Sequence, residues 1–524
     1  MSSGRSTQGD AGASAGTGDR GGRWWAALAG VVAGAVTIAV ASLVAALLRT
    51  EHSPLSALAS AVVDASPPWL VEFAKDTFGT ADKSVLAVCV VVVAGVLSAV
   101  AGLVARRSFV GGAAVVVALS AVVAAAAAAR PGGGATDVAA VVVGAVAGLV
   151  VLRSLVARVP AGEPDRGATR RSFLGATGVA ALVAVGAGVG ARVASGAARA
   201  VQAVRDTIVL PVAATPVAPP PEGVQSPVPG VVPFVTPNDD FYRIDTAIRV
   251  PVVDPATWRL RIHGLVEREV EIDFAELLER DLVEARVTLT CVSNPVGGDL
   301  AGNALWLGLP VRELLAEAGP LPDADMVLSR SVDGFTASTP IEALTDGRDA
   351  LLAVGMNGEP LPVDHGFPVR LVVPGLYGFV SATKWVVDLE VTRFDRAEAY
   401  WTERGWSERG PVKTASRIDV PRTATRAEPG VIMVGGTAWA QHRGVVRVEI
   451  RVDDGEWHDA DLAAEDTIDT WRQWSYAWDA TEVTSGDHRI TVRAWDADGP
   501  QPEGPVDVVP DGAEGWHHVS VRFP

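Results

Sequence analysis

The stretch Val287-Thr288-Leu289-Thr290-Cys291-Val292-Ser293-Asn294 is typical of a buried β-strand that ends on a cysteine. Cys291 is one of two cysteines in the 524 residues, and the other, Cys89, lies far away within a long apolar run. The two cysteines therefore predict neither a disulfide framework nor a CxxC motif. A lone cysteine is by default a small buried apolar residue, so the function of Cys291 depends on the sequence around it.

The sequence on either side of Cys291 predicts two folded domains. Residues 258–266 alternate like a strand and residues 274–282 have a helical pattern, which is typical of an α+β fold over residues 236–400. Residues 411–524 change to short strands separated by turn sequences such as Asp-Asp-Gly, which predicts a β-sandwich. Residues 205–235, rich in Pro, Ala and Val, predict an extended, semi-rigid linker before both domains. The strands expected in the sandwich are 445–452, 473–478, 488–495 and 517–523.

The first 204 residues have the composition of a membrane domain. Five segments, mostly Ala, Val, Leu and Gly, come near the ~20 residues that span a bilayer, the fourth only with its flanks. We expect a cytoplasmic tail (1–23) and then a five-helix transmembrane domain (24–204). Arginines cluster in alternate loops, so the positive-inside rule places those loops in the cytoplasm and everything after residue 192 outside. The five segments are residues 24–48, 85–105, 109–129, 138–152 and 173–191.

Just before the fifth segment stands Thr169-Arg170-Arg171-Ser172-Phe173-Leu174-Gly175. This string resembles the twin-arginine export signal, although paired arginines also serve as ordinary positive-inside anchors. The twin-arginine route carries folded, cofactor-loaded domains. The motif at 169–175 therefore implies a cofactor that is inserted in the cytoplasm.

Charge and motifs exclude several functions. The first 204 residues carry 16 Lys and Arg against 10 Asp and Glu, and the remaining 320 carry 28 against 51, a net charge of −23 that argues against nucleic acid as a partner. The apolar segments hold almost no ionisable side chains, so we expect an anchor rather than a transporter. His52 is the only histidine before His263, so the bundle alone cannot supply two histidine ligands to a haem. The sequence contains no Walker A loop and no HExxH motif.

Further motifs accompany Cys291 in a fixed order. They include Gly302-Asn303-Ala304-Leu305-Trp306-Leu307-Gly308, His365-Gly366-Phe367-Pro368-Val369-Arg370 and Ser381-Ala382-Thr383-Lys384-Trp385. With the strand that ends on Cys291, these motifs resemble the molybdopterin-binding domain of the sulfite oxidase family. Lys413-Thr414-Ala415-Ser416-Arg417-Ile418 and later segments resemble the immunoglobulin-like dimerisation domain that follows in this family. The resemblance covers about residues 236–524.

The resemblance implies a molybdenum–molybdopterin cofactor whose metal is held by the thiolate of Cys291, a soft ligand suited to such a metal. Asn238, with Asp239 as the alternative, belongs to an entry motif that contacts the pterin. A planar Arg370 fork suits a phosphate, although without the family Arg370 could be a surface ion pair and Lys384 a solvated strand residue. The implied cofactor-binding residues are Asn238, Phe241, Tyr242, Ser331, His365, Arg370, Ser381, Ala382, Thr383 and Lys384.

The resemblance implies an oxidoreductase that transfers an oxygen atom to or from a small substrate outside the cell membrane. The alternatives are a sulfite dehydrogenase, a reductase of S-oxides or N-oxides, and a non-catalytic anchored binding module. Sulfite-oxidising members keep arginines close to the metal, whereas residues 292–298 contain none, which leaves Arg330 or Arg393 as substitutes.

The electron partner and the oligomer are also expectations. The sequence has no CxxCH site and no cysteine cluster for iron and sulfur, so electrons should pass through an external carrier. A cytochrome attracted by the acidic domain and a quinone-linked subunit docked on the helices are the two candidates. The resemblance further implies that the C-terminal domain can form a homodimer.

Overall fold

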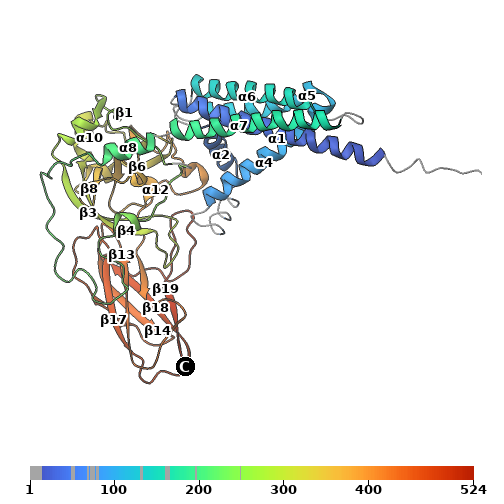
Figure 1. The fold of residues 1–524 in the computed structure, drawn as a ribbon. Coiled ribbons are helices and arrows are strands. Elements are labelled where there is room, and N and C mark those ends of the chain that lie inside the picture. Colours follow the sequence, from blue (N-terminus) through green and yellow to red (C-terminus); the bar gives the residue numbers. More distant parts are fainter. Residues whose placement is uncertain are drawn as a thin grey trace, which may run out of the picture. The chain divides into compact units, whose positions relative to one another are not determined.

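The structure is a computed structural model that describes residues 15–48, 53–67, 70, 73, 77, 82–129, 134–159, 166–194, 197–247 and 250–524 (Figure 1). The chain divides into two compact units between Ala200 and Val201. The first unit is helical, and the second contains four sheets with short helices.

The described helices of the first unit pack around one central helix. These helices are α1 Ala15–Leu48, α2 Pro54–Asp64, α4 Asp82–Arg107, α5 Phe109–Ala128, α6 Ala135–Val156 and α7 Arg166–Ala194, and α8 Ala197–Arg205 crosses the division. α1 packs against α4, α6 and α7. A Cβ on Gly30 of α1 would lie 2.0 Å from the Ser98 carbonyl oxygen of α4, so only glycine allows this close approach. Small residues of this kind are typical of helix packing within membranes.

Four helices in the described part of the first unit are long and apolar enough to cross a membrane. They match the first four predicted segments, and the fourth helix exceeds its predicted range at both ends. The fifth predicted segment, 173–191, lies in α7, where the apolar helix assigned among the described residues is Leu174–Gly190, shorter than the ~20 residues that span a bilayer. A count of five spans is therefore not confirmed. The four spans are Gly22–Leu48, Val85–Arg107, Phe109–Ala128 and Ala135–Val156.

Two features of the sequence fall on parts of this unit that cannot be compared with the structure. The backbone of the motif at 169–175 belongs to the first turns of α7, but the side chains of Arg170 and Arg171 lie outside the described part of the chain. His52 also lies outside the described residues.

The first domain of the second unit has two sheets. One sheet has the strand order β2-β1-β10-β5-β6, and the other has the order β3-β4-β7-β8 with β9 paired to β7. The expected strand at 258–266 is β1, which pairs in parallel with β10. The strands are β1 Arg259–Gly264, β2 Val270–Asp273, β3 Val283–Thr290, β4 Ala301–Pro310, β5 Met326–Ser331, β6 Thr336–Pro340, β7 Leu351–Met356, β8 Glu359–Pro360, β9 Arg370–Val372 and β10 Val386–Thr392.

Short helices cover these sheets because of local sequence signals. α10 buries Val311, Leu314, Leu315 and Ala318, the spacing of one helical face, and its C-cap Gly319 adopts φ 67°. α9 begins with a capping box and ends after five residues, so the helix expected over 274–282 is shorter than predicted. The helices are η2 Asn238–Asp240, α9 Phe274–Leu278, α10 Val311–Ala318, α11 Glu342–Thr345, η3 Val363–His365, α12 Gly378–Ser381 and η4 Thr402–Arg404.

The second domain is the predicted β-sandwich. One sheet has the order β11-β13-β17-β16 and the other β12-β19-β18-β14-β15. Their inner faces share a core that includes Trp474 and Ile490. All four expected strands are present. The strands are β11 Ala415–Val420, β12 Thr425–Arg426, β13 Val431–Trp439, β14 Val445–Val452, β15 His458–Asp459, β16 Asp461–Leu462, β17 Arg472–Asp479, β18 Gly486–Asp496 and β19 His517–Phe523.

The Pro-rich segment 205–235 differs from a free spacer. Ala214 N–H donates to the Leu282 carbonyl in the first domain (2.8 Å), and Ser226 N–H donates to Oε1 of Gln473 in the second domain (2.6 Å). Ser226 is buried. The segment therefore lies along both domains, because its backbone groups find partners there.

Candidate functional site

Cys291 lies at a turn directly after a buried strand. β3 pairs with β4 from Val283 opposite Gly308 to Thr290 opposite Ala301. Cys291 N–H then donates to the Leu300 carbonyl (2.9 Å), and its own carbonyl accepts from Asn294 N–H (3.1 Å). The thiol is thereby fixed in a buried position at the end of the strand, as the sequence predicts.

The predicted entry motif forms an aromatic cluster beside this strand. The Phe241 ring stacks on Tyr242 with 5.2 Å between centroids and meets the edges of Trp306 (5.8 Å) and His365 (5.6 Å). A Cβ on Gly302 would lie 2.7 Å from the Phe241 ring, so the glycine makes room for it. Phe241 is thus buried in this cluster, and its contact with the cofactor stays a prediction.

Asn238 anchors the same loop to the rest of the domain. Its Oδ1 accepts from Nδ2 of Asn357 (2.9 Å), and its carbonyl accepts from Nε2 of His365 (3.1 Å). The neighbouring Asp239 is exposed. The structure thus turns Asn238 rather than Asp239 towards the other residues of the candidate site.

Arg370 is a buried cation that no acidic side chain balances in the described part of the chain. Its guanidinium donates to the carbonyls of His365 (3.1 Å), Leu371 (3.3 Å) and Ala382 (3.4 Å), and it lies 5.1 Å from the centre of the Trp306 ring. Burial lowers the pKa of Arg370 to about 10. Within the described ranges no carboxylate forms an ion pair with it. A buried charge of this kind is costly without a counter-ion, so the site suits an anionic group such as a phosphate.

Lys384 and His365 lie beside Arg370, but neither of them carries an unbalanced charge. Lys384 Nζ pairs with Oδ2 of the buried Asp245 (2.9 Å), so its charge is already balanced, and burial lowers its pKa to about 8. Burial, helped by Arg370 and Lys384, lowers the pKa of His365 to about 4, so the imidazole is neutral at pH 7. Because Nε2 of His365 donates to a carbonyl, Nδ1 is left as an acceptor.

Tyr242 connects these cations with the thiol. Burial raises the pKa of its hydroxyl far above the usual value, Cys291 raises it further, and Arg370 opposes this increase. The phenol is therefore close enough to interact electrostatically with both the sulfur of Cys291 and the guanidinium of Arg370. We call Tyr242, His365, Arg370 and Lys384 the cationic cradle.

The remaining predicted residues lie at the end of β5 and at the end of α12 or just after it, and their hydroxyls bind protein groups. Ser381 Oγ donates to the Tyr377 carbonyl (2.9 Å), and Thr383 Oγ1 lies 2.7 Å from Ser329 Oγ. Ser331 is buried, and the next residue donates to the Trp385 carbonyl (3.0 Å), which places Ser331 near Lys384. Ala382 contributes its carbonyl to Arg370. Direct cofactor contacts from Ser331, Ser381 and Thr383 remain predictions.

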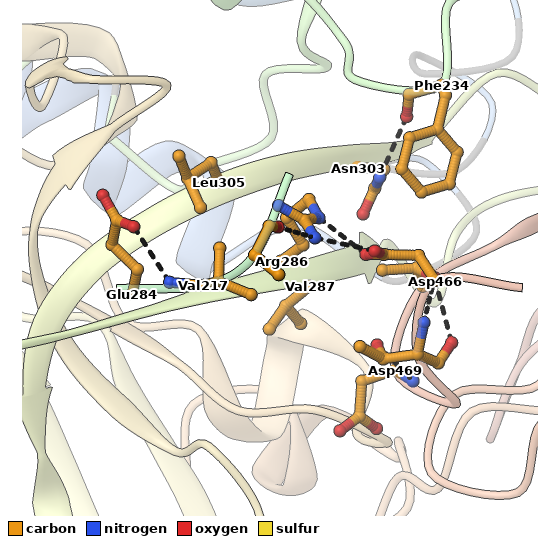
Figure 2. Close-up of polar contacts among 12 residues, drawn as sticks. Val217, Phe234, Glu284, Arg286, Val287, Asn303, Leu305, Asp466 and Asp469 are labelled. Carbon is orange, nitrogen blue, oxygen red and sulfur yellow. Dashed lines mark hydrogen bonds and ion pairs between the residues drawn. The ribbon is translucent and has the colours of Figure 1, made fainter. Parts of the chain in front are cut away.

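The strand that leads to Cys291 is also held by the second domain. Arg286 of β3 forms a buried ion pair with Asp466 (2.6 Å from Nε to Oδ2), and Thr288 N–H donates to the Asp469 carbonyl (3.0 Å) (Figure 2). Nε2 of Gln441 donates to the Thr288 carbonyl (2.9 Å) and to Thr290 Oγ1 (2.9 Å). The sequence does not identify these residues, because their partners are far away in the chain.

The residues present fit a molybdenum–pterin cofactor. Among the described residues, no group of three or more His, Cys, Asp or Glu side chains could hold a metal ion by itself. A metal on Cys291 therefore needs its other ligands from an organic group, such as a pterin dithiolene. The unbalanced charge of Arg370 offers a partner for the phosphate of that group.

Comparisons with known proteins identify the same domains. Residues 247–401 match the family model "Oxidoreductase molybdopterin binding domain", and residues 416–492 match "Bacterial Ig domain". The sulfite oxidase of Gallus gallus is 32% identical over 293 residues, which are 47% of this chain and 63% of that protein. The uncharacterized oxidoreductase YuiH of Bacillus subtilis (strain 168) is 30% identical over 157 residues, which are 30% of this chain and 76% of that protein.

The chain spans only part of the longer relatives, from 52% to 63% of the length of the sulfite oxidases that it matches. Over the shorter YuiH protein the match is more complete, because it covers 76% of that protein. The chain therefore belongs to the sulfite oxidase family of molybdopterin-dependent oxidoreductases, whose molybdenum cofactor the cationic cradle is suited to hold.

Proposed function

We propose that this chain is a membrane-anchored oxidoreductase that transfers an oxygen atom to or from a small substrate outside the cytoplasmic membrane. The observation that carries the proposal is that one domain holds both the buried Cys291 thiol and the buried Arg370 guanidinium, which donates only to carbonyls among the described residues. When bound, the molybdenum cofactor supplies two-electron oxygen-atom transfer. Cys291 would hold the metal, Arg370 would bind the phosphate, and the neutral His365 would offer Nδ1 to the pterin.

Catalysis is tested with artificial electron carriers. Purified full-length protein should contain about one molybdenum and one pterin per chain, and it should oxidise sulfite or reduce an S-oxide or N-oxide with such a carrier. The sulfite dehydrogenase alternative is supported by the 32% identity to a sulfite oxidase. Protein that lacks both metal and pterin would favour a non-catalytic binding module.

The location outside the membrane rests on the sequence of the helical unit. The four apolar helices support an anchor, and with α7 as a fifth span the arginine-rich loops favour an external position for everything after α7. We infer that the motif at 169–175 directs export of the folded domains. Replacing Arg170 and Arg171 by lysine keeps the charge, so it should strand the domains in the cytoplasm only if a twin-arginine signal operates. Protease added to whole spheroplasts would still digest the variant's domains if the motif is a plain anchor.

The electron partner should be an external carrier. The described part of the chain holds no further metal-binding cluster, and the residues after 204 have a net charge of −23. This charge favours a basic cytochrome over a quinone-linked subunit. Turnover with a basic cytochrome should fall as salt rises, because exposed charges are screened within ~10 Å at 0.1 M. Salt-independent turnover would favour the docked subunit, and light scattering would test the expected homodimer.

A further inference from the structure

A small cavity borders the turn that carries Cys291. Its volume is about 20 Å³, and its walls come from both domains of the second unit. Thr290 and Asn294 flank Cys291 in the sequence, and Tyr377 is close enough for Cys291 to raise its pKa. A cavity of this size has room for little more than one water-sized group, so it accepts the small polar end of a ligand. We call it the neutral pocket, and its polar and aromatic lining includes Thr290, Asn294, Tyr377, Ser416, Trp439 and Gln501.

Two hydrogen-bond donors in the neutral pocket have no acceptor among the residues that the structure describes. Oδ1 of the buried Asn294 accepts from Leu300 N–H (2.9 Å), which fixes the orientation of the amide, and no acceptor among the described residues binds its Nδ2. The Tyr377 hydroxyl accepts from Lys413 N–H (3.3 Å), and its own proton has no acceptor in the described ranges. Burial raises the pKa of Tyr377 to about 12, so the phenol keeps that proton at pH 7.

No residue in the wall of the neutral pocket is charged. The cations nearest to it in sequence are balanced by acids, because Arg417 pairs with Asp419 (2.7 Å) and Lys413 pairs with both Asp511 (2.8 Å) and Glu514 (2.8 Å).

His517 touches Gly297 of the wall, but burial, with His518 and Arg417, lowers the pKa of His517 to about 4, so it is neutral. Arg393, a substitute suggested by the sequence, pairs instead with Asp395 (2.8 Å).

We propose that the neutral pocket binds a small neutral molecule through a hydrogen-bond-accepting oxygen, as in S-oxides and N-oxides, and disfavours doubly charged anions such as sulfite. A dianion would be buried without a cation, which is costly, whereas a neutral oxygen can accept from Asn294 Nδ2 and from Tyr377. The inference rests on the proposed function, since it takes the neutral pocket as the substrate site.

The test compares two inert ligands of similar shape. Dimethyl sulfone is neutral and sulfate is a dianion, and both have a tetrahedral sulfur. Each is titrated into full-length, cofactor-loaded protein without an electron donor, and binding is followed by calorimetry and by the fluorescence of Trp439 and its neighbours. We expect dimethyl sulfone to bind at least about tenfold more tightly than sulfate, a difference of ~1.4 kcal/mol.

Two variants sharpen this test. Asn294→Asp keeps the acceptor for Leu300 N–H but removes the Nδ2 donor, so it should weaken binding of the sulfone about tenfold. Val296→Arg adds a cation at a wall residue whose side chain is 38% exposed, so it should make the pocket bind sulfate. Tighter binding of sulfate by the unmodified protein, or sulfone binding that both variants leave unchanged, would overturn the inference.

Metal and pterin analysis of the same sample distinguishes a failure of the oxidoreductase proposal from a failure of the neutral-pocket proposal. Normal molybdenum content with a preference for sulfate overturns the neutral pocket and leaves the oxidoreductase proposal standing. Absence of molybdenum overturns the oxidoreductase proposal, while the preference between the two ligands still decides the charge selectivity of the pocket.

Discussion

The cationic cradle and the neutral pocket both lie near Cys291, but they differ in how they treat buried charge. The cationic cradle buries the guanidinium of Arg370 without an acid, whereas the neutral pocket has no charged wall residue and its neighbouring cation Arg417 is paired with Asp419. A permanent phosphate charge repays the cost of burying a cation, but a substrate that must enter and leave does not need one. The unpaired guanidinium of Arg370 is thus the place where we propose that the cofactor phosphate binds.

The two regions also differ in their origin. The residues of the cationic cradle come from one domain, whereas the walls of the neutral pocket come from two, so only the pocket depends on how the domains are joined. A substitution at Asp466 tests this difference, because Asp466 of the second domain forms a buried ion pair with Arg286 of the first.

The largest effect is expected for Asp466→Ala. Removing one partner of a buried pair leaves the other charge unbalanced, which typically costs about 3–5 kcal/mol. The midpoint of thermal unfolding should fall and the neutral pocket should lose ligand affinity, while the pterin content of the folded protein stays normal. A matched control is Arg261→Met, which removes an exposed pair with Glu269 (2.9 Å) and should cost under ~1 kcal/mol. Equal effects of the two variants would contradict the role of Arg286 and Asp466.

Arg370→Met should empty the cationic cradle. Truncating one partner of a buried, hydrogen-bonded charge pair costs about 2–5 kcal/mol, so pterin bound per chain should fall by more than about tenfold. Arg370→Lys keeps the charge but loses the fork, and it should retain part of the pterin. Pterin is measured by fluorescence after oxidative release. Arg393→Met, which breaks an exposed pair with Asp395, serves as the control, and full pterin content in Arg370→Met would contradict the phosphate assignment.

His365→Asn should have the smallest effect, on acid stability. Burial lowers the pKa of His365 to about 4, so below pH ~6.5 the unfolded chain binds a proton that the folded chain does not. Stability should therefore fall as the pH drops from ~6.5 towards 4, by at most ~1.4 kcal/mol per pH unit. Cofactor-free His365→Asn should lose less stability over this range than the cofactor-free parent, as measured by unfolding in denaturant. Identical pH slopes would contradict the neutral histidine.

The sequence predicts the residues whose signal is local. Cys291 follows an unbroken run of strand residues, and His365 and Arg370 stand five positions apart within one short motif. The order of these motifs along the chain is therefore enough to propose the three residues as site residues. The residue types also indicate their chemistry, because the thiol of Cys291 suits a metal and the planar cation of Arg370 suits a phosphate.

The neutral pocket could not be predicted in the same way. Trp439 and Gln501 reach it from a domain that begins more than a hundred residues after Cys291, and nothing in their local sequence differs from an ordinary sandwich core. The sequence also does not show whether a hydroxyl binds the cofactor or the protein. Thr383 Oγ1, for example, lies 2.7 Å from Ser329 Oγ, a neighbour that only the fold provides. The fifth span is not confirmed, because only the part Leu174–Gly190 of α7 is assigned as an apolar helix among the described residues.

The central claim is that Cys291 supplies the thiolate that holds the metal between these two regions. The most direct test is the absorption and electron paramagnetic resonance spectrum of purified full-length Cys291→Ser, recorded beside Cys89→Ser. A hydroxyl is a poor substitute for a thiolate on molybdenum, so the Cys291 variant should lose the sulfur-to-metal absorption band and its activity with an artificial carrier, while Cys89→Ser keeps both. A metal spectrum of Cys291→Ser identical to that of the unmodified protein would contradict the account.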